Sequence, residues 1–108
     1  MSRRLSLPRT MWSQLGPVPV EVVPTLFDEE GKPASGLYLP DRRVIQVEAG
    51  MDLKVQVQTV LHEAAHMWLL DAELRLGKRE ESVVNTVSIG TFNAVFGRWV
   101  AQKHSQSA

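Results

Sequence analysis

Apolar residues in the second half of the chain recur at intervals of three and four, which is the spacing of amphipathic helices. A first helix is predicted from residue 53 to about residue 76, with Asp52 as its N-cap and Gly77 as its C-terminal stop. A second, long helix is predicted from about residue 80 to residue 102. Its expected buried stripe consists of Val83, Val84, Val87, Phe92, Val95, Phe96 and Trp99.

The first half of the chain predicts short strands. Residues 18–23 are rich in β-branched side chains, and the prolines in and after this stretch limit it to a short or edge strand. Residues 37–39 and 44–47 predict a hairpin that follows a polar loop over residues 28–36. Ahead of these strands, residues 8–16 predict a short helix, because a proline stands at the start and a Gly-Pro pair at the end.

The order of these elements predicts an α+β fold, with a short N-terminal helix, a small three-stranded sheet and two further helices. The 108 residues suffice for one domain with a modest core, which we expect to span residues 8–102. Residues 1–7 are expected to be disordered, and residues 103–108 are expected to form a flexible polar tail.

Composition and charge narrow the classes of function. Twelve Lys and Arg balance twelve Asp and Glu, and this zero net charge argues against nucleic-acid binding. No segment approaches the roughly 18 apolar residues of a membrane span, and no apolar run of signal length follows the two arginines near the start. We therefore expect a cytoplasmic protein that binds neither nucleic acid nor membranes. Because cysteine is absent, any metal ion would be held by His, Asp or Glu.

The first long helix carries the pattern His62-Glu63-x-x-His66. Residues four apart lie on nearly the same face of a helix, so both imidazoles are able to approach one ion. Glu63 lies about 100° round the helix from His62, where it is able to reach a water on that ion. This spacing is the signature of zinc peptidases, with two histidine ligands and one general base. The alternative is an ordinary helix that carries two histidines.

A catalytic zinc site usually has three protein ligands and a water, so a third ligand is needed. The extended motif with a third histidine does not apply, because Ala72 stands six residues after His66. Glu73 shares the face of His66, but it lies two turns and about 10 Å further along the axis.

The expected third ligand is Glu81, at the start of the second long helix, with Glu80 as the alternative. Both acids also suit a helix N-terminus through the helix dipole alone. Glu81 reaches the level of His66 only if the first helix ends soon after Leu70, or if the two helices cross steeply.

Two further residues are candidates for supporting roles. Asn85 lies one turn after Glu81, where it is placed to hydrogen-bond a histidine ligand from outside the metal centre. Tyr38, in a predicted strand, offers a phenol that could stabilise developing oxyanion charge. The simpler role of a tyrosine in a strand is packing.

Three stretches together resemble a known family of enzymes. The residues are TVLHEAAHMW at 59–68, EESVVN at 80–85 and SGLYLPDRRVIQV at 35–47. They resemble small zinc metallopeptidases of the gluzincin type, in particular the ImmA/IrrE-like peptidases and minimal phage-encoded metallopeptidases. The resemblance covers roughly residues 8–100.

This resemblance implies a minimal zincin-like domain with one Zn²⁺ bound by His62, His66 and Glu81, and with Glu63 as the general base. It implies hydrolysis of peptide bonds in a specific intracellular protein, in a phage-related or regulatory setting. The partner would be a protein or peptide substrate. The alternative is a non-catalytic zinc-binding module of the same fold that regulates or binds another protein, in which Glu63 would have no chemical task.

Overall fold

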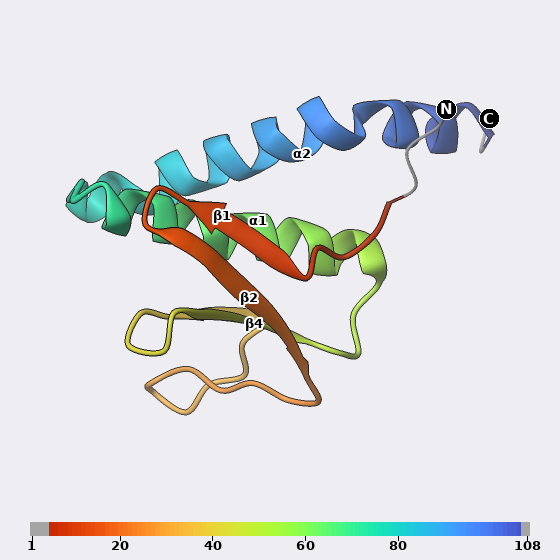
Figure 1. Ribbon diagram of the computed structural model, residues 1–108. Helices are drawn as coiled ribbons and strands as arrows, with labels where there is room; N and C mark the ends of the chain where they lie inside the picture. Colours follow the sequence, from red (N-terminus) through yellow and green to blue (C-terminus); the bar gives the residue numbers. More distant parts are fainter. Residues whose placement is uncertain (1–4, 107–108) are drawn as a thin grey trace.

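The computed structural model describes residues 5–106 of the chain, and side chains over residues 5–97. The protein is an α+β domain with a four-stranded mixed sheet and two long helices (Figure 1). The elements are β1 (Thr10–Ser13), β2 (Gly16–Val23), β3 (Gly36–Leu39), β4 (Val44–Glu48), α1 (Leu53–Asp71), the 3₁₀ turn η1 (Gly77–Arg79) and α2 (Glu80–Gln106). Within the described part of the chain, neither helix is long and apolar enough to cross a membrane.

The strands follow the order β1-β2-β4-β3 across the sheet. β2 and β4 are parallel, whereas β1 pairs with β2 and β3 pairs with β4 in antiparallel fashion. α1 lies between the sheet and α2, so the molecule has three layers (Figure 1). β3 is an edge strand, and over residues 5–106 its only partner strand is β4. This places a free strand edge beside α1.

The predicted short helix over residues 8–16 is wrong, because this segment forms β1 and the turn into β2. Its side chains alternate between exposed and half-buried, with the period of a strand. Gly16 follows the two-residue turn with a φ of 117°, which glycine adopts without steric cost. A helix of nine residues is only marginally stable alone. As a strand, the same segment forms hydrogen bonds with β2 and becomes part of the sheet. The sheet therefore has four strands rather than the three expected.

The core is built from two clusters that share α1. The first joins the sheet to the inner face of α1 and contains Val18, Ile45, Val47, Val60, Ala64 and Met67. The second joins α1 to α2 through Val57, Leu61 and Phe92. Leu5 and Leu7 pack against this second cluster, inside the segment expected to be disordered, and residues 1–4 lie outside the described residues. α1 is therefore held on two sides, which fixes the orientation of its histidines.

β3 approaches α1 closely at Gly36. A Cβ atom at this position would overlap the methyl group of Thr59 and would lie 3.2 Å from the carbonyl oxygen of Gln46. Only glycine leaves room for the helix at this point. Because Gly36 has no side chain, the free edge of β3 lies close to the turn of α1 that carries Glu63.

α1 ends at Asp71, which meets the requirement that it stop soon after Leu70. Glu73 adopts the left-handed conformation with a φ of 57°, and the N–H groups of Glu73 and Leu74 bond back to carbonyls of the last turn. This is the Schellman arrangement that closes many helices. Gly77, the expected stop, instead begins the 3₁₀ turn that leads into α2.

α2 begins at Glu80, as expected, and runs past the predicted end at residue 102. Val84 and Phe92 are buried against α1, but Val87 and Val95 are about 40% exposed (40% and 39%), so the predicted stripe is too wide. The side chain of Trp99 lies outside the described residues. α2 contacts α1 along one side, and no other helix or strand of residues 5–106 covers its opposite side (Figure 1).

Candidate metal centre

His62 and His66 project from the middle of α1 toward the start of α2. Their ring centroids lie 5.0 Å apart with an angle of 70° between the ring planes. The side chains are 27% and 22% exposed, so both rings are partly sheltered but accessible from solvent. Ala64 and Ala65 within the same turn are buried in the core. One face of this turn therefore anchors the helix while the other presents the histidines.

Glu81, on the first turn of α2, completes a cluster with the two histidines. Its Oε1 lies 2.8 Å from Nε2 of His66, and its Oε2 lies 3.3 Å from Nε2 of His62. One ligand atom from each of the three residues lies within 4.8 Å of the others. A tetrahedral ion with bonds of about 2.0–2.1 Å requires ligand atoms about 3.4 Å apart. Two histidines and one glutamate, a known ligand set of catalytic zinc, therefore fit such an ion with small side-chain adjustments.

Glu80 approaches the opposite side of the His66 ring. Its Oε2 lies 2.7 Å from Nδ1 of His66. The two adjacent acids therefore contact different nitrogens of His66. Glu81 faces Nε2, inside the cluster, and Glu80 faces Nδ1, outside it. When Nδ1 of His66 donates its proton to Glu80, Nε2 keeps the lone pair that a metal ion needs.

The same contacts show why a cation suits this cluster. A neutral imidazole has one N–H, so His66 is unable to donate to Glu80 and Glu81 at the same time. A cation between Nε2 of His66 and Glu81 would remove this conflict. Three carboxyl groups, those of Glu63, Glu80 and Glu81, also gather around the two histidines, and a divalent cation would offset their mutual repulsion.

Glu63 lies beside the cluster and points along the helix toward β3. The pKa of its carboxyl is raised to about 7, mainly by burial and to a smaller extent by the charge of Glu81. The charge of His66 and a backbone hydrogen bond from Tyr38 act in the opposite direction and lower the pKa. A carboxyl group that exchanges its proton near neutral pH is suited to general acid–base chemistry.

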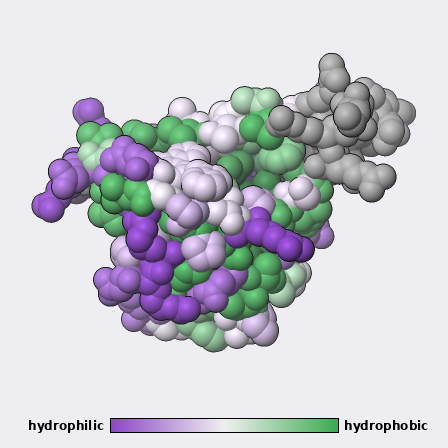
Figure 2. Space-filling view, viewed as in Figure 1, coloured by the Kyte–Doolittle hydropathy of each residue, from purple (hydrophilic) through white to green (hydrophobic). Residues whose placement is uncertain are grey.

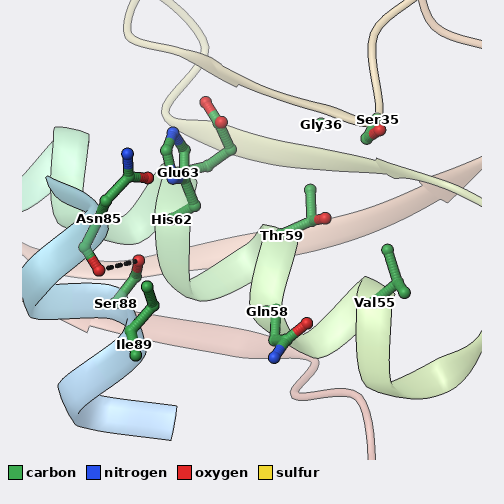
Figure 3. Close-up of a pocket in the computed structure, with 10 residues that line it drawn as sticks. All are labelled: Ser35, Gly36, Val55, Gln58, Thr59, His62, Glu63, Asn85, Ser88 and Ile89. Atoms are coloured by element: carbon green, nitrogen blue, oxygen red, sulfur yellow. Dashed lines mark hydrogen bonds between the residues drawn. The ribbon is translucent and has the colours of Figure 1, made fainter. Parts of the chain in front are cut away.

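A cavity of about 520 Å³ opens on one side of Glu63. Figure 3 shows α1 along its floor, the start of β3 above it and α2 at its side. It is lined mostly by uncharged polar and apolar residues: Ser35, Gly36, Val55, Gln58, Thr59, His62, Glu63, Asn85, Ser88 and Ile89. The His62 side of the cluster therefore opens into this space.

A second cavity, of about 320 Å³, opens on the other side of Glu63. It lies between the end of β3 and the turn that follows α1. Its lining is Tyr38, Pro40, Glu63, His66, Leu70, Leu74, Arg75, Leu76, Gly77 and Glu80. Glu63 lines both cavities, so each of them borders the expected general base.

Asn85 and Tyr38, the two candidates for supporting roles, line different cavities. Asn85 lines the larger cavity with His62 (Figure 3), but within the described residues no hydrogen bond joins its side chain to either histidine. Its backbone carbonyl accepts a hydrogen bond from Ser88. Tyr38 lines the smaller cavity, and its hydroxyl lies 3.4 Å from Nη1 of Arg43. Burial raises the pKa of the Tyr38 phenol, so it remains a proton donor at neutral pH.

A hydrogen-bonded cluster around Asp71 supports the smaller cavity and has no signal in the sequence. Both Nη atoms of Arg43 lie 3.1 Å from the Asp71 carboxylate, which also accepts a hydrogen bond from the hydroxyl of Ser13. Gln14 donates to the carbonyl of Asp71 at 2.6 Å. Asp71 thus ties both hairpins to the end of α1, the β3–β4 hairpin through Arg43 and the β1–β2 hairpin through Ser13 and Gln14.

Comparison with protein-family models, curated proteins and solved structures finds no match to this chain. The case for any function therefore rests on the side chains described above.

Proposed function

We propose that the protein is a zinc-dependent peptidase with a minimal zincin-like domain of the gluzincin type. One Zn²⁺ would be held by His62, His66 and Glu81, and Glu63 would act as general base. The observation that carries the proposal is the approach of Glu81, from α2, to Nε2 of both histidines on α1. Glu63 does not share in this cluster and remains free for chemistry.

The proposed reaction is hydrolysis of a peptide bond by an activated water. When bound, the ion would lower the pKa of a coordinated water to about 7 and polarise the peptide carbonyl. Glu63 would accept a proton from that water, whose oxygen would bond to the carbonyl carbon. Glu63 would then donate the proton to the amine nitrogen that leaves as the C–N bond breaks. Beside a bound cation Glu63 would be ionised at the start of this cycle, because an opposite charge stabilises a carboxylate. Tyr38 lines the smaller cavity together with Glu63, and its phenol is a candidate donor to the charge that would develop on the carbonyl oxygen.

The free edge of β3 supports a peptide as substrate. An extended peptide is able to pair with an exposed strand edge and to place alternate side chains in neighbouring pockets. β3 runs beside Glu63, with one cavity on each side of this residue. The proposed substrate is a specific protein inside the cell, in the phage-related or regulatory setting that the sequence resemblance implies.

A second candidate is a non-catalytic module, and one observation favours it. Glu80 and Glu81 are able to satisfy the two histidines without an ion, because every short contact of the cluster joins a ring nitrogen to a carboxylate oxygen. In that case these residues would simply hold α2 against α1. A zinc ion that holds the helices together without hydrolysis is the other form of this alternative.

Metal content and hydrolysis together separate these functions. We expect purified protein supplied with zinc to hold about one Zn²⁺ by elemental mass spectrometry. His62→Ala and Glu81→Ala should lose it, whereas Glu63→Gln and the surface variant Glu30→Gln should keep it. A degenerate peptide mixture should be cleaved by the wild type and not by Glu63→Gln. A wild type that stays metal-free would contradict the proposal, and a zinc-loaded protein that cleaves neither the peptide mixture nor a proteome digest would favour the non-catalytic module.

A further inference from the structure

The smaller cavity has an unusual concentration of leucines for a surface hollow. Leu70 and Leu74 are 54% and 52% exposed, and Leu76 is half-buried beside them. We propose that this cavity binds a large apolar side chain of a peptide, on a residue next to the bond that is cleaved. This inference rests on the proposed peptidase function and names the substrate class for that site.

The leucines are fixed in place rather than being a loose surface patch. Leu70 belongs to the last turn of α1, and Leu74 follows the left-handed residue Glu73. Its N–H bonds to the carbonyl of Leu69 at 2.9 Å, which fixes the turn. When an apolar ligand covers large apolar side chains that face water around a hollow, the removal of their surface from water favours binding. The turn therefore offers a preformed apolar wall.

The cavity is continuous with the reacting groups. His66, Glu63 and Glu80 line it together with the leucines. A side chain placed here therefore belongs to a residue whose backbone lies at the general base. Tyr38 and Pro40, from the end of β3, form the opposite wall, so a strand paired with β3 would direct a side chain into the cavity.

The charged groups around the cavity do not favour a charged side chain. Glu80 is occupied by His66, since its Oε2 lies 2.7 Å from Nδ1 of that ring. Arg75 is exposed to solvent at the rim. Burial of a charged group among the leucines would cost desolvation without a dedicated partner. Figure 2 shows hydrophobic and strongly hydrophilic side chains intermixed at the end of the molecule where α1 ends and α2 begins.

The two cavities therefore differ in the chemistry they offer. The larger one carries five uncharged polar residues, Ser35, Gln58, Thr59, Asn85 and Ser88 (Figure 3). It also carries two exposed apolar residues, Val55 and Ile89. Ile89 makes a matched control, because it lies beside the same centre but on the other side of Glu63. A volume of about 320 Å³ is at the lower limit of small-ligand sites, which typically span roughly 300–1,000 Å³, and suits one large side chain.

Binding of blocked amino acids tests the inference without hydrolysis. Wild-type protein labelled with ¹³C at leucine methyl groups, and supplied with zinc, is titrated with the N-acetyl amides of leucine, phenylalanine, lysine and aspartate. We expect leucine and phenylalanine amides to shift the methyl signals of Leu70 and Leu74, and the two charged amides to leave them unchanged. Leu74→Ser and Leu70→Ser should weaken this binding at least fivefold, and Ile89→Ser should not. Circular dichroism confirms that each variant is folded.

Two outcomes overturn the inference: no shift with any amide, or equal shifts with charged and apolar amides. Cleavage of a degenerate peptide mixture then tests the proposed peptidase separately. If the apolar amides bind but no peptide is cleaved, the cavity is confirmed as a site for apolar side chains and the peptidase proposal fails. If peptides are cleaved with no apolar preference on either side of the bond, the peptidase stands and the assignment of this cavity is wrong.

Discussion

The carboxylate of Glu80 lies 2.7 Å from Nδ1 of His66, on the opposite side of the ring from Glu81. Outer partners of this kind fix the orientation and the tautomer of a histidine ligand. We therefore expect Glu80→Gln to keep one bound Zn²⁺ per chain but to weaken its affinity about 10- to 100-fold. Competition with a fluorescent zinc chelator measures this change.

The control for this prediction is Glu81→Gln, the adjacent residue on the same turn. It should fail to retain zinc under conditions where Glu80→Gln still binds it. If the two variants change the affinity equally, the division of roles between Glu80 and Glu81 is wrong.

Glu63 provides a test in the metal-free protein. Its folded-state pKa is raised from 4.5 to about 7, so its contribution to stability is fully present below pH 4.5 and is lost as the pH rises through about 7. Glu63→Gln removes this titration. We expect the variant to gain stability relative to the wild type between pH 5 and pH 8, by about 3 kcal/mol or less at 1.36 kcal/mol per pH unit.

Urea unfolding of both proteins in the presence of a chelator, at about three pH values, measures the difference. Parallel curves for the two proteins would show that Glu63 is ionised throughout this range and would contradict its burial as the cause.

Asp71 gives the opposite dependence on pH. The hydrogen bonds from Arg43 lower its pKa below 3.8, so the stability that it contributes is present above that pH and is lost as the pH falls through the folded-state pKa. We expect the wild type to lose stability below pH 4 more steeply than Asp71→Asn does. Thermal unfolding between pH 2.5 and pH 6 measures this, with Asp28→Asn, in the loop before β3, as the control.

The sequence alone is sufficient to predict how residues that are close together in the chain are arranged. His62, Glu63 and His66 lie on one helix, and the spacing alone places both imidazoles on one face. The approach of Glu81 is predicted on the condition that the first helix end soon after Leu70 or that the two helices cross steeply. α1 ends at Asp71, earlier than the predicted end near residue 76. The stop itself was misplaced, since Glu73 rather than Gly77 adopts the left-handed conformation at the helix end.

The remaining features depend on contacts between distant segments. The pairing of Arg43 with Asp71 joins residues 28 positions apart, and neither residue type indicates its partner. Residues 8–16 contain signals for both ends of a helix, yet pairing with β2 determines their structure. The exposure of Val87 follows from the absence of a layer beyond α2 in the described structure, which no local pattern reveals. Tertiary context decides each of these.

Gly36 tests how closely β3 must approach α1. Gly36→Ala would place a Cβ atom against the methyl group of Thr59, and the backbone of β3 or α1 would have to move. We expect a loss of about 1–3 kcal/mol in the free energy of unfolding, as for other overpacked sites. Thr59→Ser removes the methyl group, so the double variant Gly36→Ala/Thr59→Ser should recover part of that loss. A double-mutant cycle by urea unfolding measures the coupling, and additive effects would contradict the contact.

Glu73 closes α1 in a conformation that non-glycine residues adopt at a cost, with a φ of 57°. Glycine adopts this conformation freely, and it is the preferred residue at this place in a Schellman turn. Glu73→Gly should therefore raise the free energy of unfolding by about 0.5–1 kcal/mol, since the cost of the left-handed conformation exceeds the extra freedom of glycine in the unfolded chain. Glu73→Ala keeps the Cβ and should give no such gain. If both variants stabilise equally, the negative charge of Glu73 near the C-terminal end of the helix dipole, and not its backbone conformation, is the cause.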